Sequence, residues 1–245
     1  MSIGTLILAS ASSGRLRLLR HAGFDPQVVV SGVDESAVTT TEPAALVMEL
    51  ALAKASAVAA AISDGLIIGA DSVLDLDGIA YGKPVDADDA RRRWSIQAGR
   101  SGVLRTGQAL LFVVGGEIRA SDVSAAAATV HFGRPDEAEL KAYLHSGEPV
   151  QVAGAFTIDA LGAQFVDSID GNVGTVIGLS LPLLRAQAAR LGIRLTDLWS
   201  TVWPTRSDAP ASMPAWISAG LSSPAGWVSS QRCPNGSCTR PSRLP

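Results

Sequence analysis

The chain has 245 residues, a net charge of −3 and a hydrophobic content of 47%. This length allows one large domain or two lobes around a sizeable core, and the charge gives no reason to expect a nucleic-acid polymer or an anionic membrane as a partner. The chain has two cysteines, Cys233 and Cys238. Because no cysteine precedes them, the residues before Cys233 can form neither a disulfide nor a thiolate zinc site with one another. No run has membrane-spanning length and no signal peptide is recognisable, so we expect a cytoplasmic protein.

The N-terminal stretch predicts a strand, a polar turn and a helix. Thr5–Ala9 is apolar, and leucines at helical spacing follow a polar segment in which Ser12 or Ser13 is a natural N-cap. The first turn of this helix has unpaired backbone N–H groups. Together with Ser10 and Arg15, these groups would form an anion site. Simple capping beside a surface arginine is the alternative interpretation.

A second strand is predicted over Phe24–Ser31, and it leads to the adjacent carboxylates Asp34 and Glu35. Such a pair suits either a divalent cation or a solvated loop. Glu42–Ala61 then predicts a long, alanine-rich helix that contains Lys54. A lone lysine on a helix is usually solvated, but the chain has so few lysines beside its many arginines that Lys54 gains weight as a functional residue.

The central stretch, Leu66–Pro84, predicts a buried strand that leads into a hairpin. Asp71 follows the apolar run, Asp75–Gly78 has the residues of a tight turn, and Lys83 lies on the returning arm. Ligands of open α/β sheets bind beyond the carboxyl ends of the strands. A carboxylate there can hold a metal or accept a proton from water, and a neighbouring lysine can hold phosphate.

The middle of the chain predicts a helix and a β-hairpin. The helix covers Asp86–Gln97, and the first strand of the hairpin covers Leu104–Val114 with an interruption at Thr106 and Gly107. The returning strand runs over Glu117–Val130.

The C-terminal part of the core predicts two helices with short extended pieces between them. Asp136–His145 has the acidic first turn that a helix dipole favours, and Leu179–Leu191 is the last helix. Ala153–Phe156 and Ala163–Ile169 are predicted to be extended, and Gly171–Gly178 is predicted to be a glycine-rich loop.

The composition changes at about Trp203, beyond which lie seven of the thirteen prolines. No strand or helix periodicity continues there. We therefore divide the chain into a domain over 1–202 and a flexible, Pro/Ser-rich tail over 203–245.

Taken in order, these stretches resemble the Maf family of nucleoside triphosphate pyrophosphatases, which is also named after septum-formation inhibition. The resemblance covers roughly residues 5–195. Each motif is weak alone, and the ordered series is specific. The matching segments are Ser10-Ala11-Ser12-Ser13-Gly14-Arg15, Asp34-Glu35, Ala51–Ala55, Gly69-Ala70-Asp71-Ser72, Gly82-Lys83-Pro84, Tyr143–Pro149, Ala153–Phe156 and Val176–Ser180.

The resemblance implies an α/β fold with a long, twisted mixed β-sheet, flanking helices, and two lobes with a central cleft. It implies hydrolysis of a nucleoside triphosphate to the monophosphate and pyrophosphate, with a divalent cation as cofactor. Oxygen ligands favour Mg²⁺ or Mn²⁺ over zinc. It is also compatible with a homodimer.

The resemblance also suggests roles for individual residues. Asp71 is the candidate general base or water-positioning metal ligand, and Glu35 is the candidate second carboxylate at the metal. The candidates for holding the triphosphate are Ser10, Arg15, Lys54 and Lys83.

Three departures from the family pattern fall at positions that the family uses to choose its base. Gly14 replaces the first arginine, Ser72 stands where threonine is common, and Asp159 stands where the pyrimidine-specific branch has glutamine. An acceptor-only carboxylate presents a different hydrogen-bond pattern from an amide. A preference for dTTP and UTP, or for a methylated base, is therefore not carried over.

Three other interpretations stay open. Asp75 and Asp77 resemble the D-x-D-G motif of haloacid-dehalogenase-type phosphatases, although Ile79 follows where threonine is usual. A site weakened by Gly14 could serve a nucleotide-binding regulator of cell division. The change of composition near Trp203 also fits an inactive homologue.

Overall fold

The computed structural model describes residues 5–200, and it centres on one mixed β-sheet. Strand β1 pairs in parallel with β2 and β3, whereas the remaining pairs are antiparallel. The path runs β2-β1-β3-β5-β6-β7, and β4 pairs with β3 alone. The strands are β1 Thr5–Ala9, β2 Gln27–Val28, β3 Gly65–Leu76, β4 Ile79–Tyr81, β5 Ser101–Val114, β6 Glu117–Phe132 and β7 Val166–Gly171.

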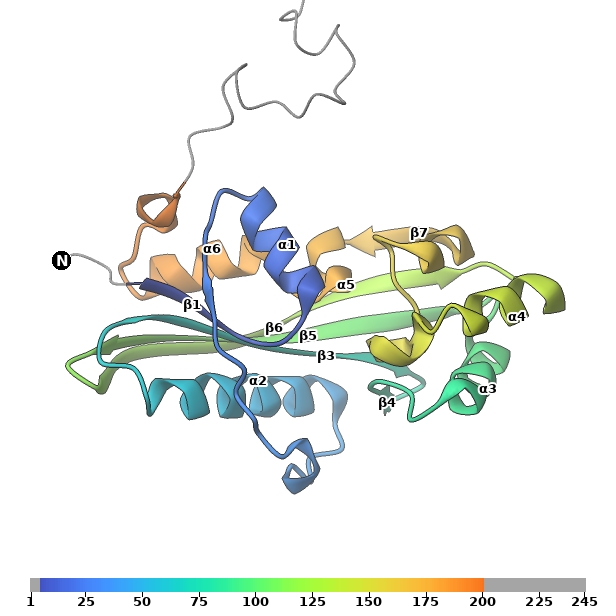
Figure 1. Ribbon diagram of the computed structural model, residues 1–245, viewed down its shortest axis with the longest axis horizontal. Coiled ribbons are helices and arrows are strands. Elements are labelled where there is room, and N and C mark those ends of the chain that lie inside the picture. The colour runs from blue at the N-terminus through green and yellow to red at the C-terminus, as the bar shows by residue number, and fades with distance from the viewer. Residues whose placement is uncertain (1–4, 201–245) are drawn as a thin grey trace, which may run out of the picture. The chain divides into compact units, whose positions relative to one another are not determined.

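Helices cover both faces of this sheet, as Figure 1 shows. Helix α2 lies on one face, α1 and α6 lie on the other, and α3 and α4 gather at one end. The α-helices are α1 Ser13–His21, α2 Pro43–Ala59, α3 Ala87–Gln97, α4 Glu137–His145, α5 Val173–Ile177 and α6 Leu181–Arg190. Short 3₁₀ turns are η1 Glu35–Ala37, η2 Pro149–Gln151, η3 Ala153–Ala155, η4 Leu161–Phe165 and η5 Leu195–Leu198. The mixed sheet with flanking helices confirms the predicted α/β fold class.

The apolar residues of β3 serve two cores because helices cover both sides of the strand. Ile67 packs beneath α2 with Ala51 and Ala55, whereas Leu66 and Ile68 point to the opposite face. A third, aromatic cluster lies around α3 and α4. Its edge-to-face contacts centre on Trp94, whose neighbours are Phe132, Tyr143 and Phe165. The aromatic cluster and the two cores along β3 belong to one compact unit, so the two lobes expected from the resemblance stay a prediction.

Polar side chains fix where most helices begin. Ser12 accepts a hydrogen bond from Arg15 N, and Asp136 forms a capping box at the start of α4. The hairpin between β3 and β4 turns at Asp77 and Gly78, which both have positive φ, as a two-residue type I′ turn requires. These local signals explain why the predicted helix starts and the hairpin are confirmed.

Two strands differ from the predicted boundaries. The second strand was expected over Phe24–Ser31, but only Gln27 and Val28 pair with β1. Pro26, which offers no backbone N–H to a ladder, explains why the strand begins no earlier. Strand β5 was expected to break at Thr106 and Gly107, yet it runs without interruption because both residues stay paired with β3. Gly107 marks a close helix contact instead of a break.

The segment after α4 also differs from its prediction. The glycine-rich stretch over Gly171–Gly178 contains α5, which Asn172 caps by accepting a hydrogen bond from Thr175 N. Ala153–Phe156 contains the 3₁₀ turn η3, and Ala163–Ile169 divides between η4 and β7. These segments are short and rich in small residues, so their sequences show no clear helical or strand periodicity. The predicted tail over 203–245 lies outside the described residues.

The ion pair between Asp122 of β6 and Arg190 of α6 makes stability depend on pH. Hydrogen bonds from Arg190, at 2.5 Å from Nε and 2.8 Å from Nη2, lower the pKa of Asp122 to about 2. The unfolded carboxyl titrates near about 3.9. The stabilisation is therefore complete above about pH 4 and is lost as the pH falls towards 2.

We expect Asp122→Asn to lower the free energy of unfolding at neutral pH, with a deficit that shrinks between about pH 4 and pH 2. Urea unfolding at several pH values would measure this. Glu117→Gln is the matched control, because Glu117 lies on the same strand and makes an exposed pair with Arg119. A deficit that stays constant with pH would contradict the assignment.

Candidate active site

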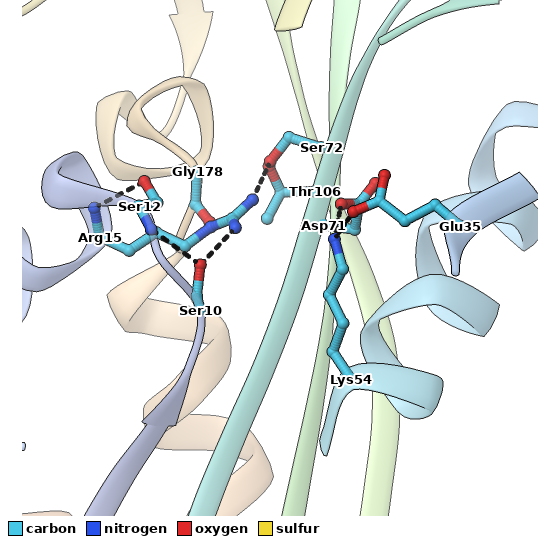
Figure 2. A network of polar contacts seen from close by, with 9 residues as sticks. All are labelled: Ser10, Ser12, Arg15, Glu35, Lys54, Asp71, Ser72, Thr106 and Gly178. Atoms are coloured by element: carbon cyan, nitrogen blue, oxygen red, sulfur yellow. Dashed lines mark hydrogen bonds and ion pairs between the residues drawn. The ribbon is translucent and has the colours of Figure 1, made fainter. Parts of the chain in front are cut away.

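Three charged side chains from three segments meet beside the sheet. The Nζ atom of Lys54 lies 2.6 Å from Asp71 Oδ1 and 2.7 Å from Glu35 Oε1. The side chains of Lys54 and Asp71 are only 11% and 13% exposed, whereas that of Glu35 is 58% exposed. Figure 2 shows the two carboxylates converging on the ammonium group. One carboxylate of the cluster is thus fixed and sheltered, and the other faces solvent.

Helix α2 brings Lys54 to Asp71 because two glycines let the helix backbone approach the sheet. A Cβ atom on Gly69 would overlap the backbone of Ala51, and one on Gly107 would overlap that of Val47. Gly107 lies directly opposite Asp71 in the ladder between β3 and β5. The glycines beside the carboxylate therefore set the distance at which α2 packs.

Asp71 lies within β3, which corrects the expectation that it follows the end of the buried strand. Strand β3 continues from Gly65 to Leu76, yet its parallel partner β1 ends at Ala9, opposite Gly69. Asp71 therefore lies just beyond the carboxyl end of the parallel pair. The expected position relative to the parallel strands is preserved, although the strand itself runs on as an antiparallel one.

Arg15 forms a second centre next to this cluster. Its guanidinium donates from Nε to Gly178 O at 2.8 Å, from Nη1 to Ser10 Oγ at 2.9 Å, and from Nη2 to Ser72 Oγ at 3.1 Å. Burial lowers the pKa of Arg15, and the negative charges of Asp71 and Glu35 partly offset that effect. A guanidinium has five N–H groups, so two remain for a ligand.

A chain of hydroxyl groups continues from Arg15 through the sheet. Ser72 Oγ lies 2.8 Å from Thr106 Oγ1, which donates to Thr175 O of α5 at 2.8 Å. The network, drawn in Figure 2, links α1, β3 and β5 and extends to the α5 segment. The sequence analysis assigned no role to Thr106, Thr175 or Gly178. A buried threonine in an otherwise apolar strand is the signal that could have indicated the first of them.

The structure therefore joins most of the predicted site residues through direct contacts. Lys54 binds both carboxylates, and Arg15 binds the two predicted serines. They form two neighbouring sets: Glu35, Lys54 and Asp71 in one, and Ser10, Arg15 and Ser72 in the other.

The other three predicted residues stand apart from these contacts. Lys83 is exposed and its side chain has no hydrogen bond or ion pair within residues 5–200. Gly14 lies in the first turn of α1, where a Cβ atom would meet Ile177 at an ordinary 3.4 Å. Asp159 forms an ion pair with Arg17 at 2.6 Å, a contact that the sequence did not indicate.

Asp159 lies on a segment that Glu148 organises. The Glu148 carboxylate accepts hydrogen bonds from Tyr143 Oη, Thr157 Oγ1, and the backbone N–H groups of Leu161 and Gly162. Partial burial tends to raise the pKa of Glu148, but these hydrogen bonds outweigh it and hold the pKa below its usual range. The segment that carries Asp159 is thus tied down at both ends.

The donor set at Asp71 and Glu35 fits a hard divalent cation that shares its coordination with a substrate. Within the described residues no group of three or more His, Cys, Asp or Glu side chains could hold a metal ion. Mg²⁺ is usually held by one or two carboxylates together with phosphate oxygens and water. The residues present agree with that pattern and not with a closed, all-protein metal site.

The carboxylates of the D-x-D-G stretch have structural partners. Asp75 accepts hydrogen bonds from Arg105 Nε at 2.8 Å and from Gly78 N at 2.9 Å. Asp77 binds both of its carboxylate oxygens to Arg100 Nη2. These contacts favour the turn interpretation over a nucleophilic role.

The chain is similar to known proteins over most of its length. A family model described as Maf-like protein matches residues 5–191. A nucleoside triphosphate pyrophosphatase of Streptomyces coelicolor is 54% identical over 198 residues, which cover 80% of this chain and 94% of the relative. A protein of the same name from Nocardia farcinica is 51% identical over 204 residues, covering 80% and 96%.

We expect Gly107→Ala to destabilise the fold by about 1–3 kcal/mol, because the new methyl group would press on α2. The same displacement should weaken the contact between Lys54 and Asp71. Urea unfolding measures the first effect. Gly82→Ala is the control, since a Cβ atom at Gly82 meets nothing within 4 Å. Equal stability of the Gly107 variant and the wild type would contradict the close-packing argument.

Proposed function

The chain belongs to the Maf-like protein family and is a nucleoside triphosphate pyrophosphatase, and we propose that it cleaves its substrate at the cluster of Lys54, Asp71 and Glu35. The products are the nucleoside monophosphate and pyrophosphate. The observation that carries this assignment of the site is the sheltered Asp71 carboxylate, held by Lys54 beside the buried Arg15 guanidinium.

Hydrolysis between the α and β phosphates needs a positioned water and neutralised phosphate charge. In our proposal Asp71 accepts the proton of the attacking water as the new oxygen–phosphorus bond forms and the bond to the bridging oxygen breaks. Lys54 fixes the orientation of the Asp71 carboxylate through its 2.6 Å contact with Oδ1. The other carboxylate oxygen, Oδ2, is left for the water and the cation.

Cations and hydroxyls around the cluster would hold the triphosphate. Arg15 has two N–H groups left for a phosphate oxygen after its three internal hydrogen bonds. Lys83 is exposed and has no side-chain partner within residues 5–200, so its ammonium group is free to bind phosphate. Ser10 would add a hydroxyl donor. Fixed donors of this kind stabilise the charge that moves to the leaving pyrophosphate.

The cofactor in this proposal is Mg²⁺ or Mn²⁺, held by Asp71 and Glu35. When bound, the cation would neutralise charge on the phosphate oxygens. Glu35 suits this role because its side chain is largely exposed and lies against the same ammonium group as Asp71.

We propose that the three positions that depart from the family pattern select the base of the nucleotide substrate. Ser72 uses its hydroxyl in the Arg15 network, and Asp159 is paired with Arg17. Gly14 leaves room beside Ile177 at the start of α1. Ranking of common and modified nucleoside triphosphates as substrates would test these positions.

The proposal also covers the protein's surroundings: a cytoplasmic location, no nucleic-acid partner and a homodimer. The net charge of −3 supports the absence of a nucleic-acid partner. Among the described residues, no helix is both long and apolar enough to cross a membrane. A role as a regulator of cell division is the alternative, and turnover that depends on Asp71 distinguishes the enzyme from it.

We expect Asp71→Asn to lower turnover by at least about a hundredfold, because an amide cannot accept the proton from water. Nucleotide binding should persist. Pyrophosphate release and calorimetric titration measure the two effects. Asp77→Asn serves as the control, because Asp77 is exposed at the hairpin tip and pairs with Arg100. Retained turnover, or loss of binding together with turnover, would contradict the role of Asp71.

We expect a chelator to abolish pyrophosphate release, and Mg²⁺ or Mn²⁺ to restore it better than Zn²⁺, because the donors are oxygen atoms. Glu35→Gln should weaken Mn²⁺ binding measured directly by electron paramagnetic resonance. Full activity in the presence of the chelator would rule out the proposed cofactor.

A further inference from the structure

Lys83 lies on the short connection between β4 and α3, and in the proposed function its ammonium group binds the substrate's phosphates. The chain leaves the β3–β4 ladder at Tyr81, which pairs with Leu74. The lysine follows two residues later; its side chain is exposed and has no partner within residues 5–200, whereas the next residue, Pro84, is buried. A flexible side chain on a flexible backbone would bind phosphate weakly, because both would have to be ordered on binding.

Arg93 of α3 donates hydrogen bonds to the backbone of this connection. Its Nη1 donates to Gly82 O at 2.6 Å, and its Nη2 donates to Lys83 O at 3.3 Å. The guanidinium carbon lies 5.5 Å from the centre of the Tyr81 ring. One planar group thus contacts three consecutive residues that end at Lys83.

Two further contacts complete the clamp. Asp89, one turn earlier on α3, binds Arg93 Nη2 at 2.7 Å and accepts a hydrogen bond from Val85 N at 3.2 Å. Gly154 N donates to Gly82 O at 3.1 Å. The backbone is therefore held on both sides of Lys83 while the lysine side chain stays free.

The need to hold α3 in place does not explain why residue 93 is an arginine. Trp94 anchors that helix independently, because it is 1% exposed and donates from Nε1 to Ala155 O at 2.9 Å. Arg93 Nε is buried without a hydrogen-bond partner among the described residues. An apolar side chain could pack on Tyr81 without leaving a buried donor unpaired.

We propose that Arg93 is a positioning residue that fixes the backbone of Gly82 and Lys83 so that the lysine ammonium is presented to the substrate's triphosphate. This inference rests on the proposed function and names a further determinant of the same site. Arg93 acts through Lys83 and touches no substrate itself.

A double-mutant cycle tests this coupling. Arg93→Lys keeps the charge but cannot reach two carbonyls with a planar fork. The cycle compares wild type, Arg93→Lys, Lys83→Ala and the double variant. Two quantities are measured with Mg²⁺ present: kcat/KM for a nucleoside triphosphate and the affinity for inorganic triphosphate. Thermal unfolding confirms that each variant is folded.

We expect Arg93→Lys to weaken triphosphate binding and kcat/KM by about tenfold when Lys83 is present, and by less than about twofold in the Lys83→Ala background. The matched control is Arg91→Ala, because Arg91 lies on the same helix and makes an exposed pair with Glu137. It should leave both quantities unchanged.

Equal losses in the two backgrounds would overturn the inference, because Arg93 would then act independently of Lys83. No loss on Arg93→Lys, or no triphosphate binding by the wild type, would also overturn it. If the wild type binds triphosphate but releases no pyrophosphate from any nucleotide, the proposed function fails, and the cycle measured by affinity still decides the role of Arg93.

Discussion

The close approach of α2 to the sheet is the constraint on which the site depends. Gly69 and Gly107 remove the side chains that would hold the helix away, and Ala51 and Ala55 fill the remaining narrow space. Lys54 is carried on the same helix face, so its position follows from backbone packing. The ammonium then lies between the two carboxylates without a flexible loop to support it. The geometry of the charges is in this sense a property of the core.

The second half of the site depends on a buried cation instead of on close packing. Arg15 satisfies three of its donors within the protein, and two of the acceptors lie on segments that are distant in sequence. Removing a guanidinium from water is costly unless such partners are present. The serine and threonine hydroxyls that follow it across the sheet spread this polar network between the helices. The network gives the substrate a cation whose position is already fixed.

Much of the fold follows from local sequence signals, whereas contacts between distant segments do not. Capping residues such as Asp136 and the turn at Asp77 and Gly78 mark boundaries that the structure confirms. The interruption predicted in β5 was wrong because Gly107 stays paired with β3 and serves the close contact with α2. The resemblance to a family pointed to Lys54, Asp71 and Glu35 together. Neither Arg93 nor the pair of Arg17 and Asp159 could be predicted, because their partners lie on elements whose arrangement the sequence does not reveal.

The bond between Arg15 and Gly178 has a consequence for the order in which the protein is made. The two residues are separated by 163 positions, although they are hydrogen-bonded neighbours in the folded chain. A growing chain on the ribosome contains Lys54 and Asp71 long before residue 178 is synthesised. During that interval the Arg15 guanidinium lacks one of its three partners, so its contacts cannot be complete until residue 178 has been added. Translation therefore completes the phosphate-binding half of the site last.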